Sequence, residues 1–112
     1  MPRKGFDPTR DHRIPRKEAA SLIQAFQAKA EAGTHRASAF NRSAFEQLLA
    51  QPNAAGIRIY HAQHKDGSPT MVMVAVDAKG VDLDHVDAVF AQNTSDCPPV
   101  CLGANLAIAR KA

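Results

Sequence analysis

The sequence predicts an α+β domain in which two N-terminal helices pack on an antiparallel β-hairpin or three-stranded meander. Apolar residues recur with helical spacing before residue 52, and from residue 56 to 76 they alternate or run continuously around an Asp-Gly turn. A chain of 112 residues is long enough for one domain with its own core. We therefore expect a basic extended arm over residues 1–15 and a single small α+β domain over residues 16–112.

The arm is set apart by its prolines and its charge. Proline stands at positions 2, 8 and 15, which prevents a regular helix. Basic side chains in the first 17 positions outnumber the two carboxylates there; they are Arg3, Lys4, Arg10, Arg13, Arg16 and Lys17. Such a segment is either a solvated tail, the interpretation we favour, or a tether that touches an acidic partner or nucleic acid.

A stripe of apolar residues predicts the first helix, over residues 16–32. Pro15 suits the first helical turn, where its missing N–H would have no partner, and Gly33 favours the left-handed conformation that ends a helix. The stripe, at helical spacing, consists of Ala19, Leu22, Ile23, Phe26 and Ala30.

A second, shorter helix is predicted over residues 42–51, with Phe45, Leu48 and Leu49 on its buried face. It ends before Pro52, which disfavours helical geometry in the residue that precedes it.

Two start signals compete for this second helix. Asn41 as the cap would allow Phe40 to pack on Phe45, whereas Ser43 followed by Glu46 has the spacing of a capping box. The sequence leaves the choice between them open.

Two strands follow. Residues 56–63 place Ile57 and Ile59 on one face and polar side chains on the other, which predicts a half-buried strand. Residues 70–76 are apolar on both faces, as in a central strand covered on each side by helices or by another subunit. The Asp66-Gly67 step between the two runs predicts an antiparallel hairpin with an exposed tip.

The remaining elements are short. A turn at residues 77–80 would return the chain as a third strand around residues 81–83, completing a meander. A brief helix should follow, with Val86, Val89 and Phe90 pointing inward. The Cys-Pro-Pro tail, residues 96–112, is expected to be irregular.

Three segments carry a resemblance. GIRIY at residues 56–60, MVMVAVDAKG at 71–80 and CPPVC at 97–101 resemble a family of small uncharacterised bacterial proteins. The likeness covers roughly residues 40–101. It implies kinship only, with no catalytic residue, no cofactor and no fixed histidine pair at the positions of His61 and His64.

The two cysteines, Cys97 and Cys101, leave three interpretations open. The intervening prolines exclude a regular helix, and the spacing differs from the two-residue gap of thioredoxin-like motifs. The pair is either a set of inert thiols, a redox-labile disulfide, or part of a metal site. A zinc site would need two further ligands, and the candidates are His61 and His64.

Function is constrained mainly by exclusion. The chain has no nucleophile elbow, phosphate loop, zinc-protease motif or dinucleotide fingerprint, and no apolar run long enough to span a membrane. We expect a cytoplasmic, non-enzymatic protein-interaction or self-assembly module without a cofactor. The alternative is a thiol-based redox or zinc-binding protein that uses Cys97 and Cys101.

Self-association is predicted from a thin core. Aromatic residues make up only 5% of the chain, so a small domain has reason to bury more surface against a copy of itself. The doubly apolar strand and the hairpin edge place the expected interface at Met71, Met73, Val74, Ile57 and Tyr60.

Overall fold

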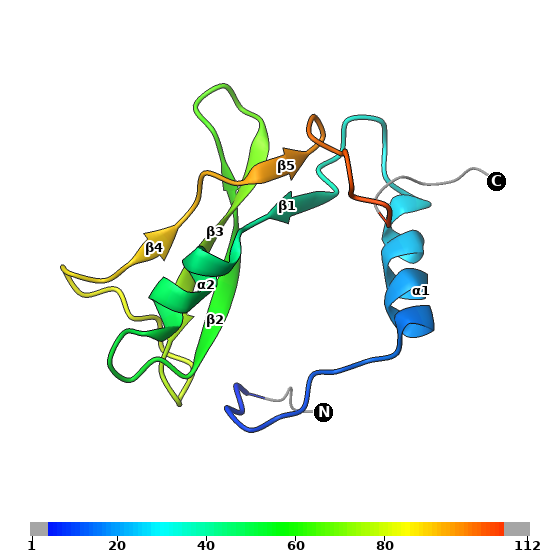
Figure 1. Ribbon diagram of the computed structural model, residues 1–112. Helices are drawn as coiled ribbons and strands as arrows, with labels where there is room; N and C mark the ends of the chain where they lie inside the picture. The colour runs from blue at the N-terminus through cyan, green and yellow to red at the C-terminus, as the bar shows by residue number, and fades with distance from the viewer. Residues whose placement is uncertain (1–4, 107–112) are drawn as a thin grey trace. The chain divides into compact units, whose positions relative to one another are not determined.

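The computed structural model describes residues 5–106 and has the α+β architecture that the sequence predicts (Figure 1). One antiparallel sheet has the strand order β2-β3-β4, and the other pairs β1 with β5. The elements in chain order are α1 (Arg16–Gln27), β1 (Ala37–Ala39), α2 (Arg42–Leu49), β2 (Gly56–Gln63), β3 (Pro69–Val76), β4 (Phe90–Ala91) and β5 (Ser95–Cys97).

The described chain forms two compact units. Residues 5–10 and 40–94 form the sheet unit, which contains α2 and the three-stranded sheet. Residues 11–39 and 95–106 form the disulfide unit, which contains α1 and the β1–β5 pair. Helix α2 packs on β2, β3 and β4, so the prediction that helices cover the hairpin is confirmed for α2, while α1 belongs to the other unit.

Strand β3 is the centre of the sheet unit. It pairs with β2 over its whole length, from Gly56 opposite Val76 to Gln63 opposite Pro69, which confirms the predicted hairpin. Residues 73–76 of β3 are each at most 1% exposed, so both faces are covered. The prediction of a central strand shielded on both sides is confirmed, and this single chain supplies the cover.

Helix α2 covers one face of β3. Leu48 is fully buried in a cluster with Met73 and Ala75. The side chain of Asn41 accepts a hydrogen bond from the Ala44 N–H at 3.1 Å, so the first of the two start signals operates.

Aromatic packing fixes the entry to α2, and the helix ends slightly earlier than predicted. The rings of Phe40 and Phe45 meet edge to face with centroids 6.3 Å apart, which is the contact predicted for a helix capped by Asn41. The helix ends at Leu49, and Gln51 makes tertiary contacts instead of extending it. Its amide oxygen accepts a hydrogen bond from the Val89 N–H at 2.9 Å.

Phe6 packs on the sheet unit from a segment far away in sequence. A Cβ at Gly56 would lie 2.9 Å from the Phe6 ring, and a Cβ at Gly80 would lie 2.6 Å from the Phe6 Cβ. Gly80 also has a φ of +82°, a conformation that other residues rarely adopt. Two glycines therefore make room for one aromatic side chain beside Val76.

The chain after β3 differs from the prediction. No third strand forms at residues 81–83, where Asp82 makes only an isolated bridge to Val76. The third strand is β4, which pairs Phe90 with Val74 and Ala91 with Met73. The helix predicted around residues 86–90 is wrong. Residues 90 and 91 instead pair with the side of β3 that faces away from β2, whose backbone N–H and C=O groups need partners.

Two of the three side chains predicted to point inward from this segment are exposed. Val86 is 98% exposed and Phe90 53% exposed, so neither points into the core as predicted. Val89, in contrast, does pack against the core cluster.

Helix α1 is shorter and more exposed than predicted. It ends at Gln27 instead of residue 32, and Gly33 takes its positive φ in a later turn. Leu22 and Phe26 are 61% and 55% exposed, so the expected burial of the stripe is wrong for these two residues. The disulfide unit offers only two three-residue strands, which is too little surface to cover the helix. Within residues 5–106, no helix combines the length and apolarity needed to cross a membrane.

Adjacent leucines in α2 test the assigned core. Leu48→Ala should lower the free energy of unfolding by about 2–4 kcal/mol, because the substitution leaves a cavity against β3. Leu49 is 49% exposed, so its predicted place on the buried face of the helix is wrong. It therefore provides the matched control, and Leu49→Ala should cost less than about 1 kcal/mol. Denaturant unfolding followed by circular dichroism measures both, and equal losses would contradict the assignment.

Candidate functional site

The outer edge of β2 is the longest unpaired backbone in the sheet unit. An antiparallel strand directs alternate N–H and C=O groups to its two sides, and β2 has β3 on one side only. Among residues 5–106, no strand pairs with the other side of these eight residues. Ile59 and Tyr60, at the middle of the strand, are 51% and 46% exposed. An open edge of this kind is able to accept a further strand.

An ionic cluster lies on β2 and holds the loop that follows β3. The Arg58 guanidinium donates a hydrogen bond to one carboxylate oxygen of Asp82, and the Tyr60 hydroxyl donates to the other. The chain reaches this position through a turn in which the Asp77 carboxylate accepts from the N–H groups of Lys79 and Val81 at 2.9 and 3.0 Å. The cluster therefore neutralises the only formal charge within the central part of the strand.

The cluster changes the acidity of its members. Its hydrogen bond to Asp82 raises the pKa of the Tyr60 phenol, because an ionised phenolate would face a carboxylate. The same carboxylate raises the pKa of Arg58 by favouring the charged guanidinium. Backbone N–H groups, that of Val81 first, lower the pKa of Asp77 by stabilising its ionised form.

The residues expected at an interface fall into two groups. Met73 and Val74 are at most 1% exposed inside this chain, so they are core residues without surface for a partner. Ile57 and Met71 are half-buried, and Tyr60 is exposed on the edge strand. The accessible part of the predicted interface therefore lies on β2.

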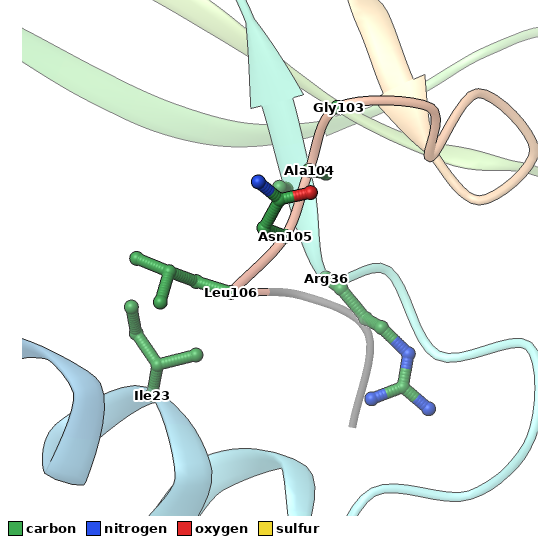
Figure 2. Close-up of a pocket in the computed structure, with 7 residues that line it drawn as sticks. Ile23, Arg36, Gly103, Ala104, Asn105 and Leu106 are labelled. Atoms are coloured by element: carbon green, nitrogen blue, oxygen red, sulfur yellow. The ribbon is translucent and has the colours of Figure 1, made fainter. Parts of the chain in front are cut away.

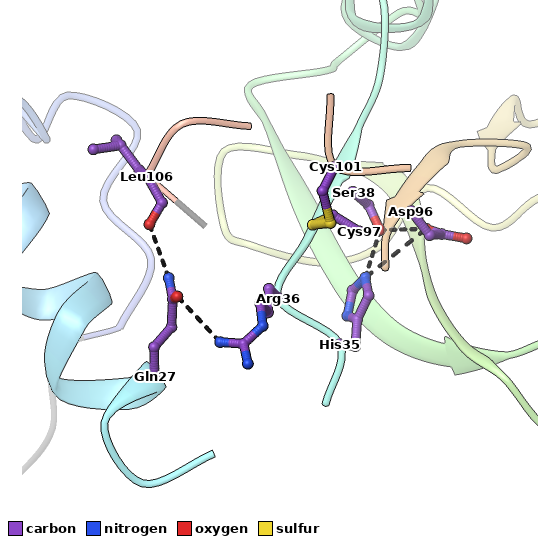
Figure 3. The surroundings of a disulfide bond; sticks show 8 residues. All are labelled: Gln27, His35, Arg36, Ser38, Asp96, Cys97, Cys101 and Leu106. Carbon is purple, nitrogen blue, oxygen red and sulfur yellow. Dashed lines mark hydrogen bonds and ion pairs between the residues drawn. A yellow bond between two sulfur atoms is a disulfide. The ribbon is translucent and has the colours of Figure 1, made fainter. Parts of the chain in front are cut away.

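In the disulfide unit, Cys97 and Cys101 are joined by a disulfide, one of the interpretations that the sequence left open (Figure 3). Cys97 is 2% exposed and belongs to β5, where it lies opposite Ala37 of β1, while Cys101 is half-buried. The backbone N–H of Arg36 donates to the Cys97 carbonyl at 2.7 Å. The disulfide is thus anchored at one end by a strand pair.

A polar cluster beside the disulfide ties β1 to β5. The Ser38 hydroxyl donates to the Asp96 carboxylate at 2.5 Å, and the His35 Nε2 lies 2.8 Å from the same hydroxyl oxygen (Figure 3). Ser38 thus links the His35 ring to the Asp96 carboxylate. The sequence carries no signal for the cluster, because Asp96 is 58 positions away from Ser38.

The described residues give no support to the zinc prediction. His61 is exposed on β2 and His64 begins the hairpin turn, both in the sheet unit, whereas the cysteines belong to the disulfide unit. Across residues 5–106, no group of three or more His, Cys, Asp or Glu side chains comes together to hold a metal ion. The disulfide also occupies both sulfur atoms.

The basic arm is only partly described. Arg3 and Lys4 lie outside the described residues. Arg10 donates to the Gly5 carbonyl at 3.1 Å, and Arg13 forms an exposed ion pair with Asp11 at 2.8 Å. These local contacts leave nucleic-acid binding by the arm as a prediction.

Comparison of this chain with protein-family models, curated proteins and solved structures finds no match.

The single tyrosine allows a direct test of the ionic cluster. Asp82→Asn should lower the pKa of Tyr60 toward its ordinary value, because the phenolate would no longer face a negative charge. The chain has one tyrosine and no tryptophan, so the near-ultraviolet absorbance of phenolate during a pH titration reports Tyr60 alone. Asp84→Asn, at an exposed neighbouring carboxylate, is the control and should leave the titration unchanged. Identical curves for the two variants would contradict the cluster.

Proposed function

We propose that this chain is a non-enzymatic self-assembly module that pairs with a second copy along the free edge of β2. The observation that supports the proposal is the eight-residue edge strand with exposed Ile59 and Tyr60 at its centre. Pairing would join two three-stranded sheets into one continuous sheet across a two-fold axis.

The edge lacks the features that commonly prevent such pairing. Natural edge strands are protected by lysines, prolines, bulges or inward-pointing charges. The central residues of β2, Ile57 to His61, include neither lysine nor proline, and the charge of Arg58 is engaged by Asp82. The backbone groups on the outer side are therefore accessible without the desolvation of an unpaired charge.

A second copy fits this edge better than an arbitrary peptide because the strand is self-compatible. In an antiparallel two-fold pair centred on Ile59, the two isoleucines would face each other, and Arg58 of each copy would lie opposite Tyr60 of the other. No like charges meet in this register, and the guanidinium next to an aromatic ring adds a favourable contact. Aromatic residues make up only 5% of the chain, so burial of this surface against a second copy would add hydrophobic stabilisation that the core alone supplies sparingly.

A charge at the centre of the edge tests the proposal. Wild type should have twice the 12.0 kDa chain mass in multi-angle light scattering at micromolar concentration. Ile59→Lys should raise the dimer dissociation constant by roughly tenfold or more, because it places two ammonium groups opposite each other. Because Ile59 is exposed in the single chain, Ile59→Lys should leave the thermal unfolding midpoint of the monomer nearly unchanged.

Val86→Lys is the matched control, since Val86 is 98% exposed and lies outside the strands. It adds the same charge and should leave the dimer unchanged. A wild-type mass equal to one chain at every concentration, or equal dissociation by the two lysine variants, would rule the proposal out.

A second candidate function is supported by a separate observation: in the disulfide, Cys97 is buried but Cys101 is only half-buried. We propose as this alternative that Cys97 and Cys101 cycle between disulfide and dithiol. A small dithiol reductant would attack the sulfur of half-buried Cys101, and Cys97 would leave as a thiolate. The second thiolate of the reductant would then displace Cys101, forming the reductant's own disulfide and two protein thiols after proton uptake.

Native mass spectrometry with and without dithiothreitol tests this alternative. The untreated protein should be lighter than the reduced protein by the mass of two hydrogen atoms. Reoxidation by oxidised glutathione should restore the lighter mass. Cys101→Ser should show no mass change, and an untreated protein that already has the heavier mass would contradict the cycle.

A further inference from the structure

The disulfide unit contains a cavity that neither proposed function uses. Its volume is about 490 Å³, which is within the range of small-molecule sites. Figure 2 shows the aliphatic side chains of Ile23 and Leu106 on one side and the Arg36 guanidinium on the other. The remaining lining residues are Ala37, Gly103, Ala104 and Asn105.

Arg36 is the chemically distinctive residue of the lining. Its Nη1 donates to the side-chain oxygen of Gln27 at 3.1 Å, and the Gln27 Nε2 donates in turn to the Leu106 carbonyl at 2.9 Å (Figure 3). Gln27 is only 8% exposed, so this pair of hydrogen bonds holds the guanidinium at the cavity from one side. A guanidinium has five N–H donors, and a single neutral acceptor leaves most of them available.

The charge of Arg36 has no counter-ion within residues 5–106. The ion pairs of that range involve Arg13, Arg42, Arg58 and His35, and none includes Arg36. Arg36 is nonetheless half-buried, and a partly desolvated cation is stabilised by an anion placed against it. Arg58 thus meets a carboxylate within the chain, whereas Arg36 meets only a neutral amide oxygen and lines the cavity.

We propose that this cavity binds a small aliphatic carboxylate. The carboxylate would accept two parallel hydrogen bonds from Arg36, the geometry for which a planar guanidinium is suited. The alkyl chain would lie against Ile23, Leu106 and the alanines, and the Asn105 amide offers a further polar contact at the rim. The Arg36 charge distinguishes this ligand from an alcohol or an amine of the same length.

Titration of the full chain with sodium octanoate, followed by amide NMR, tests the proposal. Chemical-shift changes should map to residues 103–106 and Arg36. Octanol should bind at least roughly tenfold more weakly than octanoate, and octylammonium more weakly still, because neither supplies an anion. Equal affinity for octanoate and octanol would show that the cavity is merely apolar and would overturn the proposal.

Arginine variants identify the residue responsible. Arg36→Gln should weaken octanoate binding by roughly tenfold or more and leave octanol binding unchanged. Arg42→Gln, which removes an exposed arginine of the sheet unit with an 87% exposed side chain, should bind octanoate like wild type. Wild-type affinity in Arg36→Gln, or the absence of any shift at residues 103–106, would overturn the proposal.

A cavity-filling variant guards against a loss of folding in Arg36→Gln. Ala104→Trp keeps the guanidinium but occupies space in the lining, so it should block octanoate and octanol alike. Retention of the wild-type amide shifts of Ser38 and Asp96, which belong to the disulfide unit but do not line the cavity, shows that this unit is folded in each variant. Undiminished octanoate binding by Ala104→Trp would place the ligand elsewhere and refute the site.

Discussion

The sheet unit depends on one constraint, that a strand apolar on both faces must be covered on both faces. Helix α2 places Leu48 against Met73 and Ala75, and Phe6 packs beside Val76 in space left by Gly56 and Gly80. Strands β2 and β4 satisfy the two backbone edges of β3. Four of the six buried hydrophobic side chains within residues 5–106 belong to this strand, and a fifth, Leu48, packs against it.

The disulfide unit, which contains the other described residues, buries few apolar side chains. The disulfide unit has no comparable core, and its helix leaves Leu22 and Phe26 exposed. Its strands β1 and β5 are joined by three residue pairs and are stabilised by polar contacts between Ser38, His35 and Asp96. A disulfide across a separation of four residues adds about 2 kcal/mol on the chain-entropy estimate. The disulfide unit is thus stabilised mainly by covalent and polar contacts, whereas the sheet unit is stabilised by hydrophobic burial.

Local signals in the sequence predicted the parts of the fold that depend on neighbouring residues. The cap at Asn41, the contact of Phe40 with Phe45, and the hairpin around Asp66 each lie within a few positions of their partners. The failures involve distant partners. Strand β4 depends on the open side of β3, and Gln27 bonds to a carbonyl 79 positions away. Cysteine spacing alone left the disulfide as one interpretation among three, and the cavity at Arg36 had no sequence signal because its lining comes from separate segments.

The edge of β2 and the cavity of the disulfide unit each contain an arginine, and the two arginines differ in whether a carboxylate of the chain neutralises them. Arg58 is on the edge strand and Asp82 neutralises its charge from within the chain, so the edge exposes backbone and apolar groups without an unpaired charge. Arg36 has only the neutral amide of Gln27 and borders an apolar cavity, which favours a small anion over a polypeptide. The two sites belong to different units and involve different residues. Loss of edge pairing therefore need not affect carboxylate binding, and each proposal stands or fails on its own side chains.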